Sequence, residues 1–312
     1  NCRHPDPSYL MTNPAAPLHE TLYLKAMPFV FVFLWSTGFI GAKLGLPYIE
    51  PLNFLAIRFG ISFLLMVPVV LFTRTHWPAR GQDYFHISVG GLLMHGGYLG
   101  FVFLSISYGT PAGISALIVG IQPLIVAALA GFLLKEDVSL QKWIGLLLGL
   151  AGVFLVVFNK LALGEGTYFA MSFSFIALFC IAAGTLYQKR FCSNMNIKSG
   201  NMIQFAVAGV YFFITSQIFE TGDIVWSGEL IFALLWLVFV LSLGAMTLLY
   251  LLLRSGAAAN VSSLFYLTPP CTAVVAYFLF DEQLGFLSLV GMAVAAVGVA
   301  LVNYQRKKTS GV

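Results

Sequence analysis

Residues 122–153 read QPLIVAALAGFLLKEDVSLQKWIGLLLGLAGV, and residues 268–299 read TPPCTAVVAYFLFDEQLGFLSLVGMAVAAVGV. The second stretch repeats the first at a constant spacing of 146 residues, which places Pro123 on Pro269. Without a gap, the same offset aligns Gly38 with Gly184, Lys43 with Lys189, Phe59 with Phe205, Glu136 with Glu282, Gly145 with Gly291 and Gly152 with Gly298. Matched Leu or Val would arise by chance in so apolar a chain, so the matched Pro, Glu, Lys and Gly carry the evidence. A duplication inside a membrane chain indicates transport.

The composition around these stretches is that of an integral membrane protein. Hydrophobic residues make up 59% of the 312 residues and charged residues 9%, and the mean hydropathy is +0.91. A soluble domain usually carries about 25% charged residues. Uninterrupted apolar runs of roughly 20 residues fit helices that cross a bilayer, and they contradict the alternation of a membrane barrel. We therefore expect an all-α integral membrane protein.

Gly, Pro and charged residues divide the chain into ten candidate transmembrane spans. The predicted spans are 27–46, 52–72, 85–107, 112–134, 141–158, 170–189, 199–219, 231–253, 258–280 and 285–304. Five spans fall in each copy of the repeat. An odd number of crossings makes the two copies enter the membrane in opposite senses, so we expect two inverted five-helix repeats related by a pseudo-two-fold axis in the membrane plane.

The basic residues predict the orientation. With a cytoplasmic N-terminus, the cytoplasmic side receives 13 of the 16 basic residues, which are Arg3, Lys25, Arg74, Arg80, Lys135, Lys142, Lys189, Arg190, Lys198, Arg254, Arg306, Lys307 and Lys308. This is the bias of the positive-inside rule. We expect both termini in the cytoplasm, with a 1–26 tail that lacks signal-peptide features, repeats at 27–160 and 161–306, and a 307–312 tail.

The four cysteines are scattered and show no metal-ligand spacing with histidine, so we expect no disulfide, no metal site and no cofactor.

Two groups of residues resemble a known family. The first is the run FLWSTGFIGAK at 33–43, followed by Ala56-Ile57-Arg58. The second is the doubled pattern of a mid-helix proline, a glutamate at the helix end, a glycine and a Gly-Val pair. Together they resemble the EamA-type transporters of the drug/metabolite transporter superfamily, over residues 27–306.

The resemblance implies a ten-helix inner-membrane carrier, often an exporter of amino acids or related metabolites, that works by alternating access. It also implies a central cavity lined mainly by the first, third, fourth, sixth, eighth and ninth helices. Substrates vary widely in that family, so the resemblance indicates a mechanism and not a cargo. The two copies differ at two aligned positions: the second copy has Gln204 where the first has Arg58, and Thr268 where the first has Gln122.

Two ionisable residues inside the spans are candidates for substrate binding. His95 falls near the middle of the third span, where an ionisable group is costly and suggests a site, and Tyr98 follows it on the same face. The alternative for His95 is a neutral ring hydrogen-bonded between helices. Arg58 lies six residues inside the second span, where it either snorkels to the outer interface or meets a substrate carboxylate.

Pro123 and Pro269 lie at the centres of the fourth and ninth spans, where each removes a backbone hydrogen bond and produces a kink or a polar notch. Equivalent notches in two repeats are typical of a midplane site and hinge. Gln122 and Thr268, directly before them, supply polar groups at that depth. Plain helix packing is the alternative for the prolines.

Aromatic residues in the spans expected at the cavity are further candidates, because rings suit an apolar or aromatic solute. Those chosen for substrate binding are Trp35, Phe39, Tyr187 and Tyr266, with Trp236 and Tyr250 also facing the expected cavity. Many of the aromatic residues, 15% of the chain, must instead face lipid.

The leading hypothesis is a carrier that exports a small metabolite such as an amino acid through a midplane cavity. Uptake or exchange by the same fold stays open, as does a non-transporting structural subunit. An intramembrane enzyme is disfavoured because one His and one Arg do not form a catalytic set. The expected partners are a small-molecule substrate and the lipid bilayer, without nucleic acid. Gly145 and Gly149 are candidates for a scaffold or homodimer contact.

Overall fold

The structure is a computed structural model that describes residues 18–73, 75–110, 112–136, 138–158, 167–280 and 285–304. In the first half of the chain the helices are α2 (Leu18–Gly45), α3 (Pro51–Phe72), α4 (Gly81–Gly91), η1 (Leu92–Gly97), α5 (Tyr98–Ser107), α6 (Ala112–Val119), α7 (Gln122–Leu134) and α8 (Leu140–Phe158). In the second half they are α9 (Thr167–Phe191), α10 (Ile197–Phe219), α11 (Gly228–Trp236), η2 (Leu237–Ala245), α12 (Met246–Ser255), α13 (Ala258–Ser263), η3 (Leu264–Leu267), α14 (Thr268–Phe280) and α15 (Phe286–Asn303).

The prediction of an all-helical membrane protein is confirmed. Within the described ranges, extended pairing is limited to one isolated bridge between Ile49 and Ile224. Among the described residues, six helical stretches are long and apolar enough to cross a membrane: Pro51–Phe72, Gly81–Ser107, Tyr168–Phe191, Ile197–Phe219, Gly228–Ser255 and Phe286–Asn303. Helices satisfy every backbone group within the segment, which the lipid core requires. The chain is therefore a multi-pass membrane protein.

Some of the remaining helices are short because they are interrupted. α6 ends at Val119 and α7 begins at Gln122, directly before Pro123. In the second half, α13 passes through the 3-10 turn η3 into α14, whose second residue is Pro269. Proline cannot donate the backbone hydrogen bond that continues a helix, so both interruptions lie at the repeated prolines.

Two π-helical stretches also lie at equivalent positions. η1 covers Leu92–Gly97 and η2 covers Leu237–Ala245. Adding the 146-residue offset to η1 gives 238–243, which falls inside η2. A π-helix widens the backbone and is frequent at functional sites, and η1 carries His95.

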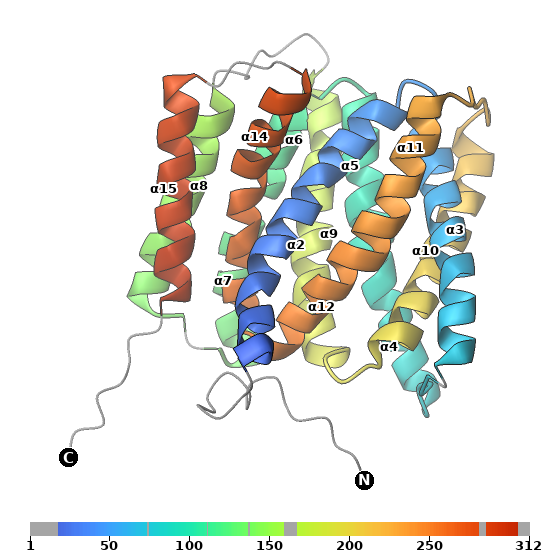
Figure 1. The fold of residues 1–312 in the computed structure, drawn as a ribbon, viewed down its shortest axis with the longest axis horizontal. Coiled ribbons are helices and arrows are strands. Elements are labelled where there is room, and N and C mark those ends of the chain that lie inside the picture. Colours follow the sequence, from blue (N-terminus) through green and yellow to red (C-terminus); the bar gives the residue numbers. More distant parts are fainter. Residues whose placement is uncertain are drawn as a thin grey trace.

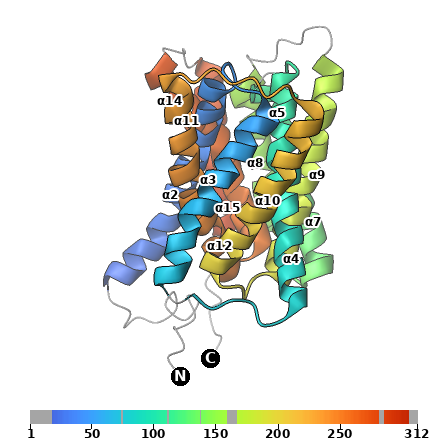
Figure 2. The same ribbon diagram turned by 90° about the vertical axis from the view of Figure 1, so that its right-hand side faces the viewer.

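Helices of one half pack on their counterparts in the other half. α8 lies against α15, and α3 lies against α10. Figure 1 shows α8 beside α15 at one side of the bundle and α3 near α10 at the opposite side, and Figure 2 shows α3 and α10 from that opposite side. Between these pairs lie α2, α9 and the broken helices, so the interior is built by both halves.

The α8–α15 pair uses the repeated glycines for close backbone contact. A Cβ atom placed on Gly298 would lie 2.5 Å from the backbone nitrogen of Gly149, and one on Gly145 would lie 2.7 Å from the carbonyl oxygen of Gly298. Such distances exclude any side chain at these positions, as in other small-residue helix contacts. Gly145 and Gly149 therefore serve packing within the chain.

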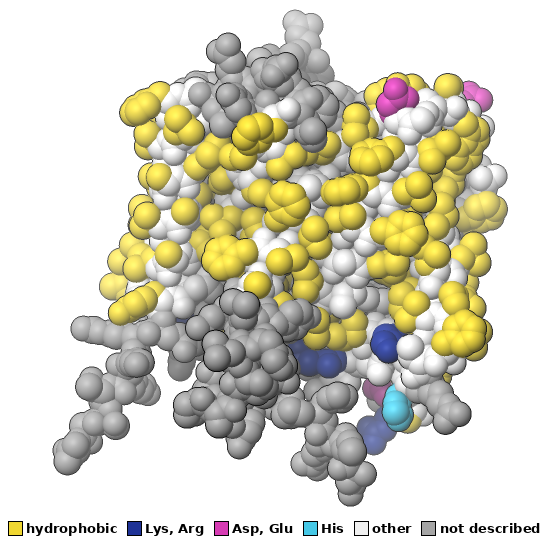
Figure 3. All heavy atoms as spheres, in the orientation of Figure 1, with side chains coloured by type: hydrophobic (Ala, Val, Ile, Leu, Met, Phe, Trp, Pro, Cys, Tyr) yellow, Lys and Arg dark blue, Asp and Glu magenta, His cyan; other side chains and the backbone are white. Residues whose placement is uncertain are grey.

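The outer surface carries the apolar side chains that lipid requires. Figure 3 shows hydrophobic side chains over the middle of one face, Lys and Arg side chains at its lower edge, and acidic side chains at an upper corner. Large hydrophobic residues such as Phe72, Phe132 and Phe278 are mostly exposed there. The charged edges and the apolar middle match the layers of a bilayer.

Candidate functional site

Arg58 lies inside the bundle. It follows two turns after the start of α3, and only 4% of the residue is exposed. Its Nε donates a hydrogen bond to Oγ of Ser242 in η2 at 3.0 Å, and its guanidinium carbon lies 5.3 Å from the ring centre of Phe59. Within the described ranges no carboxylate forms an ion pair with it. The guanidinium is buried and does not extend to the helix end as a snorkelling side chain would. Among the described residues, no hydrogen bond occupies its two terminal nitrogens.

A cavity opens beside this guanidinium. Arg58, Trp35 and Tyr98 line it together with apolar groups of α2, α5, η2 and α12, which are Gly38, Ala42, Leu99, Val102, Phe103, Ile106, Leu241 and Met246. Its volume is about 40 Å³, where one water needs roughly 10–15 Å³. This volume has room for a few waters and not for an amino acid.

Aromatic rings form one wall of the cavity. Trp35 stacks on Tyr98 with ring centres 6.5 Å apart and meets Phe265 edge-on at 5.2 Å. Trp35 comes from α2 and Tyr98 from α5, and Phe265 of η3 packs on Trp35 from outside the cavity lining. The second half of the chain contributes Leu241 and Met246 to the lining. The structure thus brings together three of the residues that the sequence predicts for the site: Trp35, Arg58 and Tyr98.

His95 packs on Phe59, the residue next to Arg58 in α3, and does not line the cavity. Its ring centre is 4.9 Å from that of Phe59 and 5.6 Å from that of Phe205, and 1% of the residue is exposed. Its Nε2 lies 3.5 Å from the Tyr250 hydroxyl, whereas Nδ1 has no hydrogen-bond partner among the described residues. A buried polar atom without a partner is costly, so Nδ1 is a hydrogen-bonding group available in the interior.

A chain of polar side chains continues from His95. The Tyr250 hydroxyl donates to Oε1 of Gln204, whose Nε2 donates to Oε1 of Gln188 at 3.1 Å. Gln204 occupies the position that Arg58 has in the first half, which explains why the polar groups of the two halves differ.

Gln122 belongs to a separate polar cluster. Its Nε2 donates to Oγ1 of Thr185 at 3.3 Å and to Oγ of Ser262 at 3.2 Å, and its Oε1 has no partner in the described part of the chain. Thr268 is also buried, with a carbonyl that accepts from Ser36 at 3.2 Å and a hydroxyl that finds no partner among the described residues. Both residues lie at the helix interruptions beside the repeated prolines.

His95, Gln122 and Thr268 do not line the Arg58 cavity, and neither do Tyr266 and Tyr187. Tyr266 packs on Gly149 of α8. The Tyr187 hydroxyl lies 2.6 Å from Nδ1 of His86, toward the end of α9. The side chain of Phe39 lies outside the described residues.

Sequence reasoning missed Ser242, Phe265 and Met246, because such residues are common in apolar spans and carry no signal of their own. Gln188 could have been found, since an amide inside a span is rare. Within the described ranges, no three His, Cys, Asp or Glu side chains gather as a metal site would require.

Comparisons with known proteins point to one family. A model of the EamA-like transporter family matches residues 25–158 and again 168–304. An uncharacterized transporter of Bacillus subtilis, YvbV, is 30% identical over 281 residues, covering 88% of this chain and 90% of that protein. A protein of Salmonella typhimurium named "Probable amino-acid metabolite efflux pump" is 25% identical, covering 86% of this chain and 90% of its own length.

A solved crystal structure shares the fold. It aligns with a TM-score of 0.75 at 16% sequence identity and covers 89% of this chain and 96% of its own. At that identity the likeness concerns the arrangement of helices alone.

Proposed function

Because this chain belongs to the EamA-like transporter family, we propose that it is a carrier that exports small metabolites such as amino acids by alternating access through a central cavity. The family and the names of its relatives indicate a transporter and not an enzyme. Relatives named as amino-acid metabolite efflux pumps, from Salmonella typhimurium and Escherichia coli, support the substrate class and the direction.

The observation that carries the proposal is the buried Arg58. A guanidinium without a carboxylate partner, held through Nε by Ser242, presents its other two nitrogens beside a small cavity. This fork matches a substrate carboxylate. Trp35 and Tyr98 supply an aromatic wall for an apolar side chain. His95 and the Gln122 cluster add unpaired polar atoms to the interior and, with Thr268, are proposed to contact substrate in other conformations.

Alternating access follows from the arrangement proposed for the two repeats, 27–160 and 161–306. Ten spans in two inverted halves are supported by the pairing of α8 with α15 and of α3 with α10, and by the equivalent π-helices. Pro123 and Pro269 at the two interruptions are the proposed hinges, because the broken backbone there bends without losing further hydrogen bonds. Rocking about them would expose the cavity to each side in turn.

The proposed location is the inner membrane, with the basic lower edge and both termini in the cytoplasm. The bilayer and a small solute are the proposed partners, with no nucleic acid. A homodimer would need a surface other than the α8–α15 glycine contact, which is occupied within the chain.

Flux measurements distinguish the proposed export from two other functions. Uptake or exchange would use the same cavity with the opposite direction of flux. A structural subunit would show no flux and would not respond to substitutions around the cavity.

The test is a solute screen in proteoliposomes with Arg58→Gln as the key variant. We expect saturable flux of amino acids, and an apparent KM that rises about 10- to 100-fold in the variant, because a hydrogen bond to a charged group contributes about 1.5–3 kcal/mol. The same screen with and without a pH gradient separates proton-coupled from uncoupled transport.

Arg190→Gln is the matched control. Arg190 is exposed at the end of α9 and donates to the carbonyl of Leu133, so its loss should leave flux unchanged. Equal flux in wild type and the Arg58 variant would contradict the carboxylate site, and absence of flux for every solute would contradict the carrier.

A further inference from the structure

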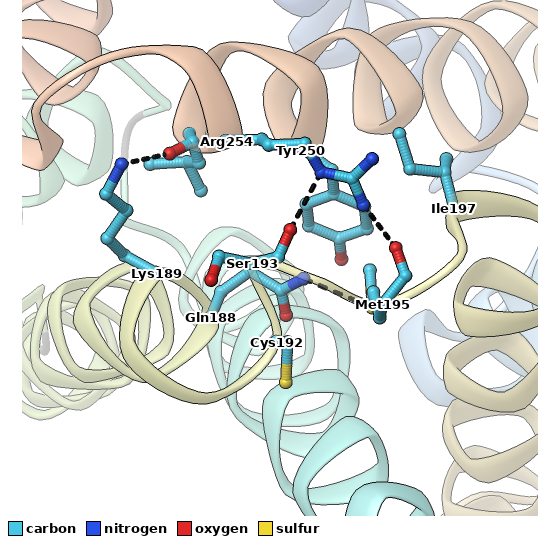
Figure 4. Close-up of a pocket in the computed structure, with 9 residues that line it drawn as sticks. Gln188, Lys189, Cys192, Ser193, Met195, Ile197, Tyr250 and Arg254 are labelled. Atoms are coloured by element: carbon cyan, nitrogen blue, oxygen red, sulfur yellow. Dashed lines mark hydrogen bonds between the residues drawn. The ribbon is translucent and has the colours of Figure 1, made fainter. Parts of the chain in front are cut away.

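A second pocket lies at the lower end of the bundle, where α9 and α12 end (Figure 4). Gln188, Cys192, Tyr250 and Arg254 line it among others, and its volume of about 10 Å³ leaves room for one water. This end carries the basic residues and is the proposed cytoplasmic side.

Arg254 closes the pocket by holding the segment between α9 and α10. Its Nε donates to the carbonyl of Ser193 at 2.7 Å, and its Nη2 donates to the carbonyl of Met195. Figure 4 shows the guanidinium reaching from α12 across to these carbonyls. Lys189 makes the opposite bridge, from α9 to the carbonyls of Leu253 and Gly256, both at 2.6 Å.

Both cations are therefore satisfied by neutral oxygens. Within the described ranges neither forms an ion pair with a carboxylate. A carboxylate is a stronger partner for a guanidinium than two carbonyls, since both groups are charged and the two-pronged geometry fits. An arriving carboxylate would thus compete for Arg254.

The pocket is joined to the interior by side chains. Gln188 and Tyr250 line it, and both hydrogen-bond to Gln204, so the polar chain that begins at His95 ends here. A group bound at Arg254 would be at the entrance of a polar route to the centre of the bundle.

The opposite end of the bundle has no such arginine. The 146-residue offset places Arg254 on Tyr108, which is exposed, whereas Lys189 falls on Lys43. The repeat keeps the lysine and changes the arginine, so this fork exists at one end of the protein only.

We propose that this pocket is a second carboxylate-binding subsite, in which Arg254 exchanges the carbonyls of Ser193 and Met195 for the carboxylate of a solute arriving from the cytoplasm. The exchange frees the 192–196 segment and opens the pocket. Binding and opening are linked because the carboxylate can occupy Arg254 only after the carbonyls have left. The inference rests on the proposed function, and it supplies a reason for loading at the cytoplasmic end.

Cys192 provides the readout. It is 2% exposed, and burial, with the nearby Asp83 carboxylate, raises the pKa of its thiol to about 12. Since the thiolate is the reactive form, alkylation is slow while the pocket is closed. Replacing the other cysteines, Cys2, Cys180 and Cys271, leaves it as the single reporter.

The experiment measures Cys192 alkylation by N-ethylmaleimide in inside-out vesicles, with L-leucine or L-leucinamide as the probe. L-leucine should accelerate alkylation on the order of tenfold, as expected for one charge-assisted contact, and L-leucinamide, which lacks the carboxylate, should not. Arg254→Gln should react fast with either probe. Arg254→Lys, which keeps the charge and one donor direction, should react at an intermediate rate and respond weakly to L-leucine.

Arg190→Gln is the matched control, because Arg190 lies in the last turn of α9 and does not hydrogen-bond to Ser193 or Met195 in the described structure. This variant should behave as wild type. An unchanged rate in both Arg254 variants would overturn the closure by Arg254. Equal effects of the two probes on wild type would overturn the carboxylate subsite. Arg58→Gln separates this inference from the proposed function, because it should raise the apparent KM for flux yet keep the L-leucine response at Cys192. An L-leucine response in a wild-type protein that transports no solute would count against the carrier and not against the Arg254 subsite.

Discussion

Glu220 and Glu50 form reciprocal hydrogen bonds where α10 ends and α3 begins. Glu220, just after α10, accepts the backbone N–H groups of Leu52 and Asn53 in the first turn of α3, at 2.6 and 2.7 Å. Glu50, just before α3, accepts those of Thr221 and Gly222, both at 2.9 Å. Glu220 satisfies N–H donors that the first turn of α3 leaves open, and Glu50 binds two N–H groups of the segment that follows α10. The two halves of the chain are thereby tied at this end.

The titration of Glu220 tests the hydrogen bonds that its carboxylate accepts from α3. Burial raises the pKa of the Glu220 carboxyl, and hydrogen bonds from Leu52 and Asn53 oppose the rise. Asn53→Ala removes the side-chain donor and should raise this pKa further. The carboxyl shift of Glu220 in a ¹³C-labelled sample reports it.

The linkage to stability has a defined sign. Because the pKa is higher in the folded state, Glu220 stabilises the fold most below its unfolded value, and this contribution is lost as pH rises through the folded pKa. Tm in detergent should fall across that window in wild type and not in Glu220→Gln. A midpoint at or below the usual range of glutamate would refute the assignment.

At the scale of single residues, the sequence predicts the buried residues of types that are rare in apolar spans. Arg58 and His95 could be found because ionisable groups seldom lie inside apolar spans. The partner of Arg58 could not be found, because Ser242 resembles other serines of the chain and is 184 positions away. Tyr266 and Tyr187 were chosen for their type and span, and only the structure shows that they pack on Gly149 and His86.

At the scale of helices, the close packing of α8 on α15 depends on the glycines at their contact. Gly298→Ala adds a methyl group 2.5 Å from the backbone of Gly149, so the helices must separate. Overpacking of this kind costs about 1–3 kcal/mol. Thermal unfolding in detergent should show a lower Tm for the variant.

Gly60→Ala is the control for this prediction. Gly60 lies within α3 and has nothing within 4 Å of an added Cβ, and alanine favours a helix over glycine by up to about 1 kcal/mol. Its Tm should stay level or rise. Equal loss in both variants would mean that close packing of α8 on α15 is not the cause.

The predicted stretches are helical because they are long apolar runs bounded by Gly, Pro and charged residues. In lipid, the backbone N–H and C=O groups of such a run can form their hydrogen bonds within the run only as a helix. The interruptions at Pro123 and Pro269 were predicted as kinks, since proline removes a donor wherever it falls. The π-helices were not predicted. The residues of η1 and η2 carry no sequence pattern that distinguishes a π-helix from an α-helix.

For the whole molecule, the 146-residue repeat indicated an architecture before any contact was known. The structure adds that counterpart helices pack on one another and that the polar groups of the halves differ where Arg58 corresponds to Gln204. The central claim is that one cavity is reached from both sides of the membrane in turn.

The most direct test is the accessibility of Val102→Cys, in a protein without its native cysteines, to a membrane-impermeant maleimide applied to each side of oriented vesicles. Val102 lines the Arg58 cavity and is 4% exposed in this conformation, whereas Leu64→Cys, at a 65% exposed position on α3, serves as the lipid-facing control. We predict that Cys at 102 is labelled from both sides and that a transported solute slows both reactions, while the control is labelled from neither. Labelling of position 102 from one side only, unaffected by any solute, would contradict alternating access.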